Sequence, residues 1–180
     1  MRYAVRAMPA PSDKPRVTHR SHEFACRLVW SGAEQGGTQN YADYSREYQI
    51  EFEGKPVLRG SAAPVFRGDD GLHNPEDLLV AALSGCHLLS YLALCARGGV
   101  VVAAYSDYAW GKMEAVEGKL RFTQVILRPN VLIAAESSLA KARALHEEAH
   151  AQCFIANSVN FPVEHQATVR LLDYAGLGTD

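Results

Sequence analysis

An α+β fold is predicted for this chain of 180 residues by three observations. Strand-like segments precede one long apolar helix, and further strand-like segments surround a second helix. A hydrophobic content of 48% suits one globular domain with a sizeable core. This order of elements favours antiparallel meander sheets around a central buried helix over a doubly wound parallel sheet.

The first part of the chain predicts a flexible N-terminal arm. Residues 1–21 contain three prolines and many polar residues, and the domain proper is expected to span residues 22–175. No apolar stretch follows Arg2 and Arg6, so no secretory signal is visible and a cytoplasmic location is expected. The net charge of −2 gives no indication of a nucleic-acid surface.

Three strands are expected before the long helix, and their order follows from the alternation of apolar residues. They span residues 22–30, 48–54 and 56–62, with a tight turn at Gly54 and Lys55 between the last two. The helix should begin at Asn74 as N-cap, with Pro75 at its first position and Glu76 and Asp77 in its first turn, and should run to about Arg97 before Gly98 and Gly99.

The second half predicts two long strands, a helix and a final strand. The strands cover residues 100–118 and 119–133 and meet at a turn formed by Glu117 and Gly118. The helix is expected over residues 137–158 and the last strand over residues 163–174, after Pro162.

The long helix is apolar on nearly every face. Ser84, Gly85, His87 and Ser90 interrupt its apolar stretch, so we expect a core helix and no membrane span. A helix of this kind in so short a chain needs more cover than one sheet and one other helix supply, which predicts a homodimer.

Four cysteines are present, at positions 26, 86, 95 and 153, without the spacing of a zinc ribbon or a CxxC motif. Cys26 and Cys95 have no signature around them and are expected to be buried in the core. Cys86 and Cys153 also lie in apolar surroundings, and either one alone would be interpreted as inert packing.

The segment from Asn74 to Leu78, followed by Ser84-Gly85-Cys86, resembles the signature of the OsmC/Ohr family. Glu76 precedes Cys86 by the ten residues typical of that family, and Cys153, followed by Asn157 and Ser158, is similar to its second cysteine motif. The resemblance covers about residues 22–174. It implies an OsmC-like fold and an intertwined homodimer with active sites at the interface.

The resemblance also implies a function, that of a cysteine-based organic hydroperoxide reductase without a cofactor. Cys86 would form a sulfenic acid and then a disulfide with Cys153, which a dithiol, for some members a lipoylated protein, would reduce. An arginine would stabilise the Cys86 thiolate and Glu76 would orient that arginine. Arg67 is the first choice for this arginine and Arg59 the second.

Alternatives remain at this point. The chain could be a non-catalytic OsmC-like protein that binds a small ligand or senses redox state. His146, His150 and Cys153, together with Cys86 and His87, could also hold zinc. Residues 146–150 read HEEAH and match the zincin pattern, but no third ligand follows. Otherwise His146 and His150 are expected to face solvent or a subunit interface, or His150 or His87 to tune the pKa of a cysteine.

Overall fold

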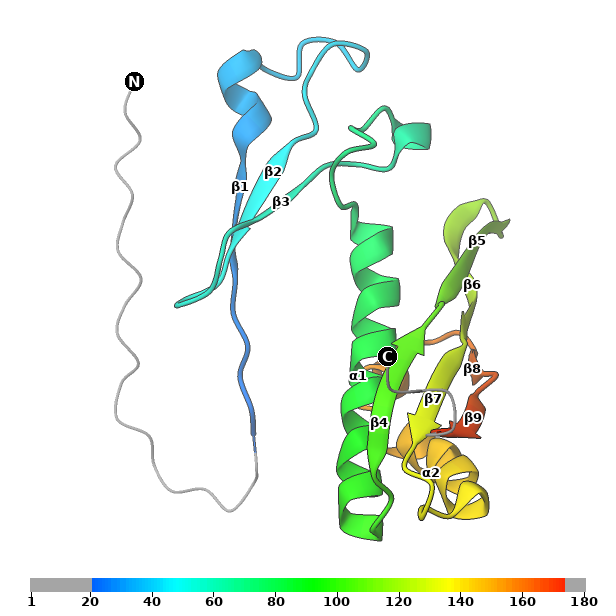
Figure 1. Cartoon of the computed structure of the whole chain (residues 1–180). Coiled ribbons are helices and arrows are strands. Elements are labelled where there is room, and N and C mark those ends of the chain that lie inside the picture. The colour runs from blue at the N-terminus through cyan, green and yellow to red at the C-terminus, as the bar shows by residue number, and fades with distance from the viewer. Residues whose placement is uncertain (1–20, 174–180) are drawn as a thin grey trace, which may run out of the picture.

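The computed structural model describes residues 21–173, so the predicted N-terminal arm lies, apart from residue 21, outside the described residues. A small N-terminal sheet stands apart from a larger body, and the long helix α1 lies between them (Figure 1). The N-terminal sheet is antiparallel, in the order of the three strands along the chain: β1 (Arg27–Trp30), β2 (Tyr48–Glu51) and β3 (Leu58–Gly60).

Two three-stranded sheets and two helices form the rest of the described chain. The helices are α1 (Pro75–Gly98) and α2 (Leu139–Gln152). One sheet has the order β4-β7-β9 and the other β5-β6-β8. Their strands are β4 (Val102–Asp107), β5 (Trp110–Val116), β6 (Lys119–Leu127), β7 (Pro129–Ile133), β8 (Val163–His165) and β9 (Thr168–Leu171). The α+β class is therefore confirmed.

Each of the three long strands that the sequence predicts is broken once, and the breaks lie side by side. β4 and β5 separate after Asp107, β6 and β7 at Arg128, and β8 and β9 after His165. At the break the Asp107 carboxylate accepts hydrogen bonds from the Arg128 backbone N–H at 2.6 Å and from the Ser84 hydroxyl at 2.6 Å. The three breaks therefore divide what would be one sheet of three long strands into two three-stranded sheets. Asp107 connects this bend to α1 through its hydrogen bond with Ser84.

The sheets of the body are mixed rather than purely antiparallel. β4 pairs with β7, and β5 with β6, in antiparallel fashion, whereas β8 and β9 pair in parallel with β6 and β7. The expectation of antiparallel meanders was wrong for this last segment, because α2 carries the chain back before the strand is added.

Helix α1 begins as predicted, with a capping box. The Asp77 backbone N–H donates to Asn74 Oδ1 at 2.8 Å, and the Asn74 backbone N–H donates to the Asp77 carboxylate at 3.4 Å. The helix ends at Gly99, whose φ of 69° is left-handed.

Only one side of α1 is buried within the chain. Leu83, His87, Tyr91, Leu94 and Cys95 form its buried stripe, while Leu89 on another face is 68% exposed. By length and composition α1 would also pass for a membrane span, although this stripe packs on the body. A single chain thus leaves part of α1 uncovered, as expected for an apolar helix in so short a chain.

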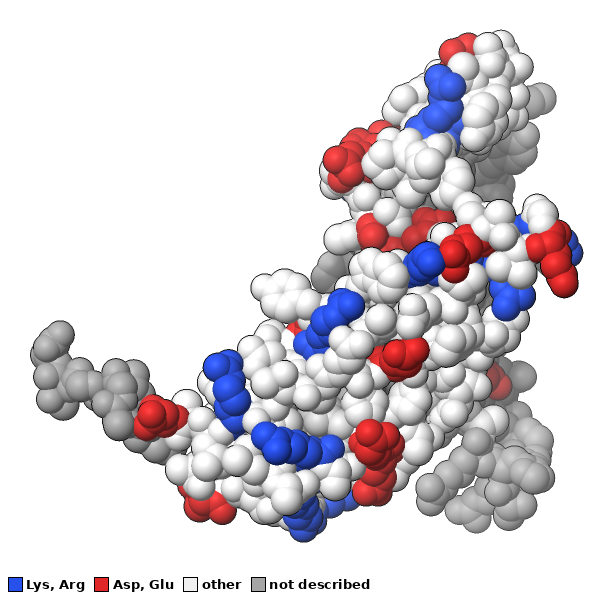
Figure 2. Space-filling view, turned by 90° about the vertical axis from the view of Figure 1, so that its right-hand side faces the viewer, with Lys and Arg blue, Asp and Glu red and all other residues white. Residues whose placement is uncertain are grey.

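The surface of the body carries mixed charge. Figure 2 shows Lys and Arg side chains interspersed with Asp and Glu side chains on the face that it presents, with wide uncharged areas between them. This pattern fits the small net charge of −2.

Candidate functional site

The side chains of Cys86 and Cys153 contact each other although they come from different helices. Cys86 lies near the middle of α1 and is partly exposed, while Cys153 caps the C-terminus of α2 and is 1% exposed. Burial raises the pKa of Cys153 to about 11, and its hydrogen bond with the Cys86 side chain adds to this. The backbone N–H of Ala156 donates to Cys153 Sγ at 3.5 Å.

The two contacting thiols are reduced and differ in their exposure to solvent. Both cysteines are free in the structure. Because a thiolate is the nucleophile, Cys153 is a poor first attacker at neutral pH, whereas Cys86 has access to solvent. The arrangement is suited to forming a disulfide in a second step.

Helix α2 ends earlier than predicted, and this end determines the position of Cys153. The helix was expected to continue to Ser158 but stops at Gln152, and Cys153 has extended backbone with ψ of 110°. The Asn157 side-chain amide donates to the Ala151 carbonyl at 3.0 Å and replaces a backbone bond at this helix end. Cys153 therefore lies at the junction of a helix and a turn, not within a helix.

Glu76 lies in the first turn of α1, nearly three turns before Cys86 by helix geometry. Its Oε2 is buried and has no hydrogen-bond partner among residues 21–173. The Tyr48 hydroxyl of β2 lies near it, since burial and then the Glu76 charge raise the pKa of Tyr48. A buried carboxylate oxygen without a donor is costly, so this position favours a cationic partner.

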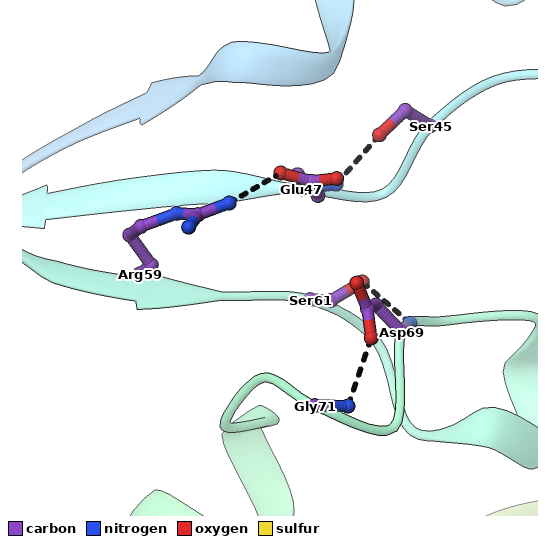
Figure 3. A network of polar contacts seen from close by, with 6 residues as sticks. All are labelled: Ser45, Glu47, Arg59, Ser61, Asp69 and Gly71. Atoms are coloured by element: carbon purple, nitrogen blue, oxygen red, sulfur yellow. Dashed lines mark hydrogen bonds and ion pairs between the residues drawn. The ribbon is translucent and has the colours of Figure 1, made fainter.

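Neither predicted arginine pairs with Glu76 in the described chain. Arg59 forms an ion pair with Glu47 at 3.1 Å, within the N-terminal sheet (Figure 3). Arg67 is exposed, in a left-handed conformation with φ of 65°, just after the 3-10 turn Pro64–Phe66. The loop before α1 is held by Ser61, which accepts a hydrogen bond from the Asp69 backbone N–H at 3.1 Å.

Sequence reasoning gave no role to another arginine, Arg46, which lies in the loop before β2. Its guanidinium donates to the carbonyls of Tyr44 and Tyr41 at 2.7 and 2.6 Å and lies over both tyrosine rings. No carboxylate partner of Arg46 is present within residues 21–173. Arg46 thus differs from Arg59, which has Glu47 as its ion-pair partner. The sequence does not reveal this difference, because it depends on which residues the fold brings together.

A groove of about 690 Å³ lies between the start of α1 and the strands β5 and β6. Glu76, Val80 and Ser84 line it from α1, and Trp110, Met113 and Phe122 line it from the strands. Gly111 allows this close approach, because a Cβ there would lie 2.8 Å from both Val80 and Phe122. The groove is mostly apolar but is also lined by the carboxylates of Glu76, Asp77 and Asp107, and neither cysteine lines it.

A buried histidine cluster lies at the junction of α1, α2 and β8. His87 Nε2 and His146 Nδ1 are 3.1 Å apart, and both side chains are almost fully buried. Burial, followed by the neighbouring histidines, lowers the pKa of His87 to about 4. Burial and then His87 lower the pKa of His146 to about 3. The expectation that His146 faces solvent or an interface was therefore wrong.

The alternative of a Cys/His metal site finds no support in the described part of the chain. No group of three or more histidine, cysteine or acidic side chains there is arranged to hold a metal ion. The zincin pattern at residues 146–150 has its first histidine in the hydrogen bond with His87 instead.

Of the remaining cysteines, Cys95 is buried as predicted, whereas Cys26 is exposed. The expected strand over residues 22–30 begins only at Arg27, so Cys26 precedes the sheet that would have covered it.

Comparisons with known proteins agree with the geometry. The family model described as "OsmC-like protein" matches residues 68–168. The solved structure of an OsmC-like protein of unknown function from Vibrio cholerae is 32% identical, with a TM-score of 0.76, over 82% of this chain and 100% of that one. The uncharacterized protein YmaD of Bacillus subtilis is 26% identical over 103 residues, which is 54% of this chain and 69% of the relative.

More distant structures share the fold. The organic hydroperoxide resistance protein OhrB of Bacillus subtilis has a TM-score of 0.55 at 16% identity, over 82% of this chain and 98% of its own. At this level of identity the similarity concerns the fold alone.

Proposed function

The chain belongs to the OsmC/Ohr family, and from this premise we propose that it is a thiol-dependent peroxidase that reduces organic hydroperoxides to alcohols. The family supports a redox or peroxide-resistance role, because several proteins of the same fold are named organic hydroperoxide resistance proteins. The observation that carries the finer proposal is the contact between the thiols of Cys86 and Cys153.

In the first step, the Cys86 thiolate attacks the terminal oxygen of the hydroperoxide. The O–O bond breaks, the sulfur gains the hydroxyl and becomes a sulfenic acid, and the alkoxide takes up a proton and leaves as the alcohol. Cys86 is the better attacker of the pair, since the pKa of Cys153 is raised to about 11.

In the second step, Cys153 attacks the sulfenic sulfur. A disulfide forms, and the hydroxyl leaves with the Cys153 proton as water. The contact between the two side chains means that this step needs no large movement. An external dithiol, which we propose to be a small dithiol or a lipoylated protein, then reduces the disulfide.

The first step requires a positive charge near the thiolate. Arg67 remains the proposed source because it directly precedes α1 and forms no ion pair within residues 21–173. Arg59 is less suited, since Glu47 already binds it. Glu76, whose buried oxygen has no donor, would orient the guanidinium.

We propose that the protein acts as an intertwined homodimer in the cytoplasm. Leu89 on α1 and Phe154 beside Cys153 are 68% and 81% exposed in one chain, and a partner subunit would cover them. The N-terminal sheet reaches the body mainly through the bridge between Gly60 and His73, which leaves it free to pack on a second subunit.

The test is consumption of cumene hydroperoxide with dihydrolipoamide or dithiothreitol as reductant. Cys86→Ser should abolish turnover, while Cys153→Ser, mixed with the peroxide before any reductant is added, should consume one equivalent and then stop as a sulfenic acid that dimedone traps. Cys26→Ser is the matched control and should keep full activity, because this thiol is exposed and far from the pair in sequence. Full turnover by Cys86→Ser would overturn the proposed mechanism, whereas a wild-type Cys86 that stays unmodified in excess peroxide would favour a non-catalytic member of the family.

A further inference from the structure

Four histidines from three elements gather behind the sulfur pair. His87 belongs to α1, His146 and His150 to α2, and His165 ends β8. The rings of His87 and His146 are 5.4 Å apart and nearly parallel, and the ring of His165 lies 5.5 Å from the first and 5.9 Å from the second. The hydroperoxide chemistry above uses none of these residues.

The cluster connects the two segments that carry the sulfurs. His87 directly follows Cys86 in α1, and His146 lies about two turns before Cys153 in α2. Their 3.1 Å contact therefore links the turn of α1 that bears Cys86 to the last two turns before Cys153.

Neighbouring contacts support this link from one side. The Tyr91 ring stacks on His146 with centroids 3.8 Å apart, and the Tyr91 hydroxyl donates to the Ala142 carbonyl at 3.1 Å. The same two helices are thus joined by polar contacts at two successive levels.

A buried polar contact is a costly way to pack two helices, since apolar side chains would avoid the desolvation of both rings. The cost is increased by ring nitrogens without a hydrogen-bond partner among the described residues, which are His87 Nδ1, His146 Nε2 and His150 Nδ1. In return, a hydrogen bond fixes the separation of two helices more narrowly than an apolar contact does.

We propose that the contact between His87 and His146 positions the sulfur pair, holding α1 against α2 so that Cys86 and Cys153 stay within bonding distance, and that acid releases it. This inference rests on the proposed disulfide between the two cysteines. His87 and His146 are positioning residues, because their rings contact each other and not the reacting atoms.

Acid acts on this contact because a hydrogen bond between two imidazoles needs one unprotonated nitrogen. Protonation of both rings would place two cations 3.1 Å apart in the core. Titratable groups from every element of the junction surround the two rings: Asp107 and Tyr105 from β4, Tyr91 from α1, His150 from α2 and His165 from β8. The Glu147 carboxylate lies 3.4 Å from His165 Nε2. Asp107 favours protonation of His87, whereas the neighbouring histidines oppose it.

The experiment measures the equilibrium between the protein and glutathione at pH 7, 6 and 5, with a selenol as exchange catalyst. Cys86 and Cys153 give two electrons and two protons to oxidised glutathione, whose S–S bond breaks as the protein disulfide forms and two glutathione thiols leave. With all thiols protonated, the equilibrium constant of this exchange does not itself depend on pH. Mass spectrometry of the alkylated protein gives the fractions of reduced and disulfide-bonded protein.

In the wild-type protein we expect the constant to fall about tenfold between pH 7 and pH 5, because the histidines of a separated pair take up protons over this range whereas those of the closed contact do not. An ionised Cys86 would produce the opposite slope, because it stabilises the reduced form at higher pH. His146→Phe, which keeps a ring against Tyr91, should lower the constant about tenfold at pH 7 and abolish the slope. His146→Gln, which keeps a donor and an acceptor but does not titrate, should keep the pH 7 value and also lose the slope.

His22→Gln, at an exposed position, is the matched control and should follow the wild-type curve. Variants with the same constant and the same slope as the wild type would overturn the positioning role while leaving the disulfide in place, because an ionised Cys86 affects the slope of all these proteins alike. If no Cys86–Cys153 disulfide forms at any glutathione ratio, both the proposed function and this inference fail. His146→Phe and His146→Gln are independent substitutions at one position, so if one of them does not fold the other still decides the test.

Discussion

The two thiols of the pair differ in environment more than in sequence context. Both are flanked by apolar residues, yet Cys86 is partly exposed and Cys153 is buried at a helix end. Burial opposes the thiolate, so the structure assigns different reactivities to two cysteines that the sequence makes look alike.

This difference predicts the order of alkylation of the reduced protein by iodoacetamide at pH 8. The exposed Cys26 and the partly exposed Cys86 should react first, while Cys153 and the buried Cys95 react at least tenfold more slowly, since both have raised pKa values. Peptide mass spectrometry over time gives the order, with Cys26 and Cys95 as internal references for exposed and buried thiols. Equal rates at Cys153 and Cys26 would show that Cys153 is not buried in solution.

At the residue scale, the sequence singled out the two cysteines but did not reveal that His146 is buried. Cys86 and Cys153 could be paired only through the family resemblance, because no local rule brings residues of two helices together. His146 and His150 were placed on one helical face correctly, but a helix without a strong apolar stripe does not show which face is buried. The burial of the His146 side chain depends on Tyr91 and His87, which lie far from it in the sequence.

At the scale of elements, local signals predicted helix starts better than strand ends. The Asn74 cap, Pro75 and Gly99 bound α1 through contacts within a few residues of sequence. The breaks in the long strands depend on Asp107, whose partners Ser84 and Arg128 come from two other elements. Alternation of apolar residues continues through such a bend and therefore does not reveal it.

The bend itself gives a prediction at this scale. Asp107→Ala removes acceptors for the Arg128 N–H and the Ser84 hydroxyl and should lower the free energy of unfolding by about 2–3 kcal/mol. Ser84→Ala removes only one of the two bonds and should cost about 1 kcal/mol. Urea denaturation followed by circular dichroism measures both, and Asp70→Ala, at an exposed position in the loop before α1, is the control. Equal stability of Asp107→Ala and the wild type would mean that the bend does not depend on this carboxylate.

For the whole molecule, the buried histidines predict a loss of stability in acid. The folded-state pKa is about 4 for His87 and about 3 for His146, below the usual 6.5, so the unfolded chain binds protons first. Stability is therefore complete above pH 6.5 and decreases as the pH falls toward the folded-state values. Each histidine should cost about 2 kcal/mol at pH 5.

Unfolding free energies from urea titrations at pH 7 and pH 5 measure this effect. A double variant with His87→Phe and His146→Phe should lose much less stability between the two pH values than the wild type does, whereas His22→Gln should lose as much as the wild type. The same slope in all three proteins would assign the acid sensitivity to other groups.

The exposed side of α1 carries the last prediction, the state of association. A helix of this hydropathy with Leu89 68% exposed leaves a large apolar surface uncovered in one chain. Since a second copy would bury this side, light scattering should give twice the chain mass of 19.7 kDa. Leu89→Glu places a charge in that interface and should shift the protein to monomers at micromolar concentration. Val101→Glu, at a similarly exposed apolar residue beyond the end of α1, should leave the mass unchanged. A wild-type protein that stays monomeric at high concentration would show that the apolar side of α1 can remain exposed to solvent. The active site, which the family resemblance places at the dimer interface, would then have to be complete in one chain.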